Sequence, residues 1–123
     1  TGIDFSASIG TPIYATADGV VATVEVKFSG YGKNVIIDHG FGYRTRYAHM
    51  HDFAVKQGQH VRRGDLIGYV GNTGISTAPH LHYEVHINGR QVDPVHYFYN
   101  DLSPDEYEKI LELSSIENQS LGM

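Results

Sequence analysis

The sequence contains no cysteine, and this absence narrows the chemistry open to the protein. Without cysteine there is neither a disulfide framework nor a thiolate nucleophile. Any metal ion must therefore be bound by nitrogen and oxygen atoms. The chain also has no apolar run approaching the ~20 residues that a helix needs to cross a bilayer. We expect no transmembrane segment in it.

A concentrated patch of positive charge is also missing. The 9 Lys and Arg residues are scattered among 14 Asp and Glu residues, which gives a formal net charge of −5. Proteins that bind nucleic acid usually gather basic residues on one face or segment. We therefore expect no nucleic-acid partner. The chain opens directly into patterned sequence without a signal peptide, so secretion cannot be read from it.

Glycine, by contrast, is abundant, and its placement indicates an all-β fold. Fourteen glycines recur between short stretches rich in Val, Ile, Tyr and Thr, which is typical of strands joined by tight turns. Strands are expected at 20–28, with the even-numbered apolar residues facing the core, and at 34–39 and 43–50. Gly40-Phe41-Gly42 and Asn88-Gly89 are expected to form hairpin turns.

The character of the sequence changes after Asn100. Ser103-Pro104-Asp105-Glu106 combines a cap, a proline at the first helical position and a capping-box glutamate. This pattern predicts one short C-terminal helix, followed by a frayed tail. We therefore divide the chain into a β-domain over 1–100 and a C-terminal helix and tail over 101–123.

Residues 80–87 alternate without a break between two kinds of side chain. His80, His82, Glu84 and His86 fall on one face of the expected strand, and four apolar residues fall on the other. The Cα atoms of His80 and His82 should lie roughly 6.6 Å apart, so both can act on one metal or one substrate. Two readings remain open on this pattern alone: a solvated sheet face that tolerates histidine, and a ligand-bearing face.

Three motifs in a fixed order resemble the lysostaphin-type family of peptidoglycan endopeptidases over about residues 1–98. The motifs are Gly2-Ile3-Asp4-Phe5, Tyr47-Ala48-His49-Met50 and the run from Gly71 to Glu84 that contains His80-Leu81-His82. The resemblance implies antiparallel β-sheets of the duplicated-hybrid-motif type, with a groove over a zinc site. It also implies a zinc-dependent endopeptidase that hydrolyses peptide bonds in peptidoglycan cross-links or stem peptides. A bacterial envelope location, periplasmic or secreted, follows from that substrate, as does membership in a longer protein with an N-terminal region.

Carried over residue by residue, the resemblance assigns roles to four side chains. Asp4 and His82 match two zinc ligands of the family. His49 and His80 match the two histidines that act beside the metal, as proton-transfer or oxyanion-stabilising groups. Which of these two is the acid or the base stays open.

The family's pattern also calls for a third ligand, a histidine four positions before Asp4. That position lies immediately upstream of Thr1 and is absent from the sequence. One explanation is that the chain starts one residue late. The other is an incomplete site, in which case the protein would be a catalytically degenerate relative that serves as a binding or regulatory module in cell-wall remodelling.

Two further residues, Glu84 and Tyr47, have alternative interpretations, and a third, His86, is too distant to be a ligand. Glu84 either orients a metal-binding side chain without itself contacting the metal, or occupies a solvated sheet position. Tyr47, two residues before His49 and so expected on the same face, either packs in the core or lines a substrate groove. His86 lies some 13 Å from His82 by strand rise, which is too far for one coordination sphere.

Overall fold

The protein is an all-β molecule built from antiparallel strands, as expected. The computed structural model describes residues 2–74 and 78–93. Within these residues no helix is present, and none is therefore long and apolar enough to span a membrane. The helix expected within 101–123 lies outside the described residues. The strands are β1 Ile3–Ser6, β2 Pro12–Tyr14, β3 Gly19–Val26, β4 Lys33–Gly40, β5 Tyr43–Phe53, β6 His60–Val61, β7 Leu66–Val70, β8 His80–Ile87 and β9 Arg90–Val92.

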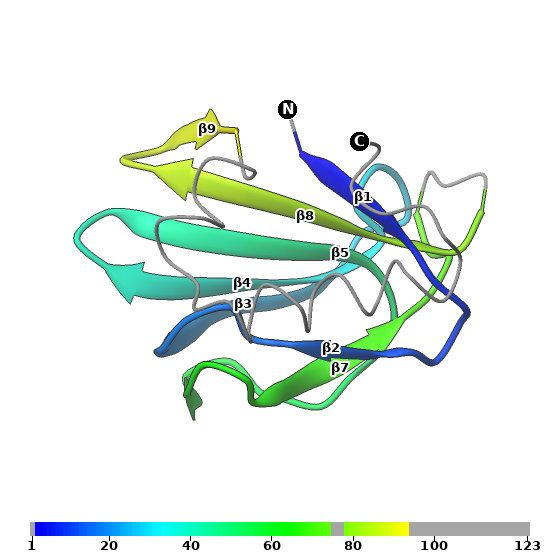
Figure 1. The fold of residues 1–123 in the computed structure, drawn as a ribbon, viewed down its shortest axis with the longest axis horizontal. Helices are drawn as coiled ribbons and strands as arrows, with labels where there is room; N and C mark the ends of the chain where they lie inside the picture. Colours follow the sequence, from blue (N-terminus) through cyan, green and yellow to red (C-terminus); the bar gives the residue numbers. More distant parts are fainter. Residues whose placement is uncertain (1, 75–77, 94–123) are drawn as a thin grey trace.

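One sheet carries most of the strands, in the order β1-β8-β5-β4-β3-β6, with β9 added to β8 (Figure 1). A second ladder, β2 with β7, is joined to this sheet through the long strand β5. The first part of β5 pairs with β8 up to Ala48, and its last part pairs with β7 from Met50. His49, between the two parts, has a left-handed backbone with φ 59°. Strand β5 therefore changes partners at the position of a candidate site residue.

Both expected hairpin turns are confirmed. Phe41 and Gly42 have φ of 54° and 78°, and Asn88 and Gly89 have φ of 50° and 79°. Two consecutive residues with positive φ match the backbone twist of antiparallel strands, and glycine and asparagine adopt this conformation at the lowest cost. Strand β8 also has the bounds expected from its alternation.

The side chains of β3 that point into the core differ from those expected. Val21 is the buried residue of this strand, at 1% exposure, whereas Val26 and Phe28 are 54% and 100% exposed. The pairing of β3 with β4 shifts between Val21 and Thr23. A bulge of this kind inserts one residue into one strand and re-aims the side chains. The core-facing residue is therefore Val21 before the bulge and the even-numbered Val24 after it. The expectation of one continuous even-numbered core face was wrong, although it holds at Val24.

The core lies between the odd-numbered face of the main sheet and the β2–β7 ladder. Its members come from the eight strands β1 to β8 and the loops between them, and include Phe5, Ile13, Ile37, Ile67 and Val85, each fully buried. The rings of Tyr47 and Tyr83 meet in the same core, with centroids 5.3 Å apart. Packing of Tyr47 in the core is thus confirmed.

The expectation that Tyr47 shares a face with His49 was wrong. Tyr47 is 1% exposed and lies among core side chains, while the ring of His49 meets the ring of His80 on the other face of the sheet. The left-handed backbone at His49 breaks the alternation that would otherwise put both side chains on one side.

Candidate functional site

Strand pairing brings Asp4 and His82 together. β1 runs antiparallel to β8 with Asp4 directly opposite His82. Asp4 Oδ1 lies 2.7 Å from His82 Nδ1. The imidazole of His82 packs against the backbone at position 2, because a Cβ on Gly2 would lie only 2.7 Å from His82 Nε2. The side chain of Asp4 is 63% exposed, so the pair is open to solvent on one side.

Two further histidines lie against this pair. His80 Nε2 is 3.5 Å from Asp4 Oδ1, and the Nδ1 of His80 bonds to the Ala78 carbonyl at 2.7 Å. The ring of His49 has its centroid 4.7 Å from that of His80 and 5.9 Å from that of His82. Three imidazoles and one carboxylate therefore converge at the end of β8 nearest β1.

His49 is held in place from two sides. Its ring Nδ1 bonds to the Thr73 carbonyl at 2.6 Å, and its backbone N–H donates to the Tyr31 carbonyl at 2.8 Å. The Thr73 hydroxyl accepts from the Lys33 backbone N–H and donates to the Met50 carbonyl. The loop before β4 and the loop after β7 thus fix the position and orientation of His49 together.

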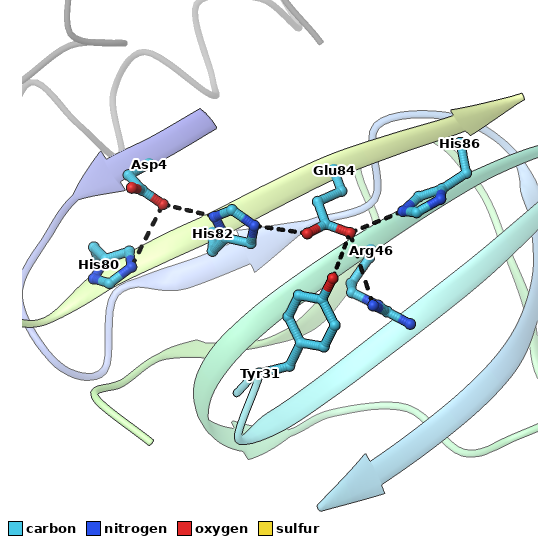
Figure 2. Close-up of polar contacts among 7 residues, drawn as sticks. All are labelled: Asp4, Tyr31, Arg46, His80, His82, Glu84 and His86. Carbon is cyan, nitrogen blue, oxygen red and sulfur yellow. Dashed lines mark hydrogen bonds and ion pairs between the residues drawn. The ribbon is translucent and has the colours of Figure 1, made fainter. Parts of the chain in front are cut away.

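Glu84 is the buried centre of a polar network that continues along β8 (Figure 2). Its Oε2 accepts a hydrogen bond from His82 Nε2 at 2.8 Å. Its Oε1 lies 2.8 Å from His86 Nε2 and accepts from the Tyr31 hydroxyl at 3.1 Å. The Arg46 Nη1 is 3.7 Å from the same oxygen. Glu84 is only 2% exposed, so the solvated reading of this position is excluded.

The surroundings shift the pKa values of Glu84, His82 and His49. Burial opposes ionisation of Glu84, but hydrogen bonds from His82, His86 and Tyr31 outweigh it and lower its pKa to about 2. Burial likewise opposes protonation of His82, yet its bonds to Glu84 and Asp4 leave its pKa raised. The pKa of His49 is lowered, mainly by burial. Of these three groups, His49 is thus the one whose surroundings favour the neutral form.

The structure brings together the four residues that the sequence singled out: Asp4, His49, His80 and His82. Sequence reasoning missed Tyr31 and Arg46. Arg46 lies directly across from Glu84 in the pairing of β5 with β8, a relation that requires the register of the two strands. Tyr31 lies in a loop, where no periodicity reveals the direction of a side chain.

The donor set of Asp4 and His82 fits a zinc ion. Zinc favours imidazole nitrogen and carboxylate oxygen, and a zinc-binding histidine usually donates its other ring N–H to a carboxylate. Glu84 stands in that position behind His82. Over residues 2–74 and 78–93, however, no group of three or more His, Asp or Glu side chains is arranged to hold one metal. A complete site needs a further ligand beside the pair.

A cavity of about 330 Å³ hollows the same face of the sheet beyond Glu84. His86 and Arg46 contact both the cavity and Glu84. The cavity is lined by Ile36, Gly42, Arg44, Arg46, His86, Asn88 and Gly89.

The sequence is similar to those of named bacterial enzymes. The chain is 54% identical over 95 residues to the DD-carboxypeptidase/endopeptidase Mpg of Neisseria meningitidis serogroup B, covering 77% of the chain and 22% of the relative. It is 50% identical over 93 residues to the peptidoglycan DD-endopeptidase ShyA of Vibrio cholerae, covering 75% and 21%. The chain thus spans about a fifth of the length of these relatives.

Solved structures show the same fold. A zinc-containing peptidase from Vibrio cholerae superposes with a TM-score of 0.73 at 44% identity, covering 75% of this chain and 28% of that one. The catalytic domain of the antimicrobial peptidase lysostaphin from Staphylococcus simulans gives a TM-score of 0.76 at 34% identity, covering 80% and 77%. The model of Peptidase family M23 matches residues 1–94. The lysostaphin-type resemblance is thereby confirmed, and the chain belongs to Peptidase family M23.

Proposed function

We propose that this domain is a zinc-dependent endopeptidase that hydrolyses peptide bonds in peptidoglycan cross-links or stem peptides. The observation that carries the proposal is the convergence of His49 and His80 on the Asp4–His82 pair. Membership in the peptidase family supports the reaction class. The relative named a peptidoglycan DD-endopeptidase supports the substrate.

Asp4 Oδ1 and His82 Nδ1 are the proposed zinc-binding atoms of the described residues. The proposed third ligand is a histidine immediately upstream of Thr1. Zinc bound there would supply a Lewis acid that polarises the scissile carbonyl and activates water at neutral pH. An envelope location and a longer parent protein are part of the same proposal.

His49 and His80 are the proposed catalytic residues, because they lie beside the Asp4–His82 pair and are not part of the proposed ligand set. Each has its Nδ1 bonded to a backbone carbonyl, so in the neutral ring Nδ1 carries the proton and Nε2 can accept one. One of them would accept a proton from the attacking water or return it to the departing amine. The other, when protonated, would stabilise the oxyanion of the tetrahedral intermediate. The lowered pKa of His49 favours the base role for this residue.

The full-length protein that carries this chain provides the test. Zinc would be measured by elemental analysis after dialysis, and cleavage by the appearance of new amino termini on purified peptidoglycan and on synthetic cross-linked stem peptides. We expect about one zinc per protein and peptide cleavage in the wild type. His82→Ala should lose both, whereas His49→Ala and His80→Ala should keep the zinc and lose cleavage by roughly 10²-fold or more.

His60→Ala is the matched control, since His60 is an exposed histidine on β6, away from the site. It should bind zinc and cleave like the wild type. A wild-type protein that binds no zinc and releases no amino termini would contradict the proposed endopeptidase activity. Such a result, together with retained binding to peptidoglycan, would favour the degenerate binding module instead.

A further inference from the structure

The two oxygens of Glu84 have separate partners. Oε2 contacts His82 Nε2 at 2.8 Å. Oε1 takes the contacts with His86, Tyr31 and Arg46. Oε2 therefore contacts the candidate zinc ligand, His82. Oε1 contacts side chains on the side of Glu84 away from Asp4 (Figure 2).

The side chains on Oε1 come from three separate places in the fold. His86 lies two residues further along β8, Arg46 lies across from Glu84 on β5, and Tyr31 reaches in from the loop before β4. Tyr31 is itself fixed, because the Arg46 Cζ lies 3.9 Å over the centroid of its ring. The same ring stacks beside His82, with centroids 6.1 Å apart and an interplanar angle of 26°. Glu84 is thus immobilised before any metal binds.

We propose that Glu84 is the positioning residue of the site: its Oε2 holds the proton of His82 on Nε2 and thereby aims the Nδ1 lone pair at the metal. Tyr31 and Arg46 act one step further back, by holding Glu84. This inference rests on the proposed function, since it takes His82 to be a zinc ligand. It adds the residue, Glu84, that sets the tautomer and orientation of that ligand.

Burial decides which of the two carboxylates accepts the hydrogen bond from the single N–H of neutral His82. In neutral His82 a single N–H is shared between two carboxylate neighbours. The side chain of Glu84 is 3% exposed, whereas that of Asp4 is 63% exposed. An exposed carboxylate can replace a lost donor with water, but a buried one cannot. The proton therefore belongs on Nε2, and Nδ1 faces Asp4 as an acceptor.

The first test reads the tautomer of His82 directly and needs no zinc. Long-range ¹H–¹⁵N NMR spectra of the metal-free protein at about pH 9, above the usual imidazole pKa, distinguish Nδ1–H from Nε2–H rings. In the wild type we expect His82 to carry its proton on Nε2. In Glu84→Gln we expect a mixture of both tautomers. Glu25→Gln makes the same change on β3, outside the network, and should leave the spectrum of His82 unchanged.

The second test measures zinc binding by competition with a chromophoric chelator. Loss of a carboxylate behind a metal-binding histidine typically weakens metal affinity by about 10–100-fold. We expect this loss for Glu84→Gln and a smaller loss for Tyr31→Phe, which keeps the carboxylate and removes one donor. The visible spectrum of the cobalt-substituted protein should change in both variants, because the ligand field depends on the orientation of His82. If Glu84→Gln does not fold, the zinc affinity and cobalt spectrum of Tyr31→Phe still test the proposal.

The inference and the proposed function fail in different ways. Wild-type tautomer, zinc affinity and cobalt spectrum in folded Glu84→Gln would overturn the positioning role, even with an active enzyme. An Nδ1–H tautomer of His82 in the metal-free wild type would overturn it as well. Failure of the zinc-loaded wild type to cleave would overturn the proposed enzyme while leaving the tautomer and affinity results intact.

Discussion

At the scale of single residues, the site shows how hydrogen-bond partners give different properties to identical side chains. His49 and His80 each bond through Nδ1 to a backbone carbonyl, whereas both nitrogens of His82 face carboxylates. The pKa of His49 is lowered and that of His82 is raised. Carboxylate neighbours favour the charged imidazolium, and burial disfavours it.

The His82–Glu84 contact should stabilise the metal-free protein within a defined pH window. The lowered pKa of Glu84 gives stability that is present above its ordinary value of 4.5 and is lost as the pH falls toward about 2. The raised pKa of His82 gives stability that is present below 6.5 and is lost as the pH rises through the raised value. The coupling free energy between the two side chains should therefore be greatest between 4.5 and 6.5.

A double-mutant cycle with His82→Gln and Glu84→Gln, followed by chemical denaturation across the pH range, measures this coupling. The exposed Lys27–Glu25 pair, 3.8 Å apart, is the reference. Its cycle should give less than about 1 kcal/mol. A His82–Glu84 coupling that does not vary with pH would contradict the expected window.

A second prediction concerns the hydroxyl groups of the core. Thr16 Oγ1 lies 2.9 Å from the hydroxyls of both Tyr47 and Tyr83. Thr16→Ala would remove one hydrogen bond from each of two buried hydroxyls, while Tyr47 keeps its bonds to Thr45 Oγ1 and the Thr16 backbone N–H. The free energy of unfolding should fall by about 0.5–1.5 kcal/mol for each lost bond. Thr16→Ser keeps the hydroxyl and should lose much less. Equal losses in the two variants, measured by urea denaturation, would assign the effect to the methyl group instead.

At the scale of elements, the loop before β4 and the loop after β7 pack closely against each other beside His49. A Cβ on Gly32 would overlap the backbone of Thr73 and Gly74, and a Cβ on Gly74 would overlap Gly30 and Gly32. The same loops carry the two carbonyls that hold His49, from Tyr31 and Thr73. The contact between the loops therefore determines the geometry of the proposed catalytic histidine.

Substitution of Gly32 tests this contact. Gly32→Ala adds a methyl group where the two backbones meet, so it should cost about 1–3 kcal/mol from overpacking, besides the strain of a left-handed residue. Gly30→Ala is the matched control: Gly30 has a similar φ, 65° against 62°, but open space around its Cβ. Both variants should lose about 1–2 kcal/mol to strain.

Only Gly32→Ala should also disturb peptide cleavage, because it moves the carbonyls that orient His49. Denaturation and cleavage assays on the two variants separate the effects. Equal cleavage by the two would show that the loop contact does not control His49.

Local patterns predicted the elements whose determinants are local. The alternation of 80–87 predicted β8 and its face, and Asn88-Gly89 predicted the turn after it. The change of inward-facing residues along β3, from Val21 to Val24, was missed because the bulge between Val21 and Thr23 depends on pairing with β4. Arg46 and Tyr31 were missed for the same reason: their relation to Glu84 depends on strand register and loop packing. The alternation also singled out His80 and His82, but Asp4 and His49 were found only because the family motifs supplied the long-range information.

At the scale of the whole molecule, the proposed metal would join an edge strand to the sheet. Among the strands of residues 2–74 and 78–93, β1 pairs only with β8, and Asp4 and His82 lie on these two strands. Removal of zinc with a chelator should therefore lower Tm, and hydrogen exchange should accelerate most at the amides of β1. With free zinc at 100 times its Kd, the stabilisation is about 2.7 kcal/mol.

His82→Ala, which lacks a metal-binding atom, should show no change of Tm with the chelator. His60→Ala should respond like the wild type. A uniform acceleration of exchange over all strands would contradict a local role of the metal at β1.

The direct pairing of Asp4 with His82 also bears on how the chain avoids misfolded forms. Neighbouring residues of a strand point to opposite faces, so a slip of β1 by one residue would place Phe5 or Ile3 opposite His82 and turn Asp4 toward the core. Such a slipped molecule would lack one of the two proposed ligands in the pair. Zinc would then bind and stabilise only chains whose edge strand is correctly aligned, so a supply of the ion would select the native alignment over its neighbours during folding.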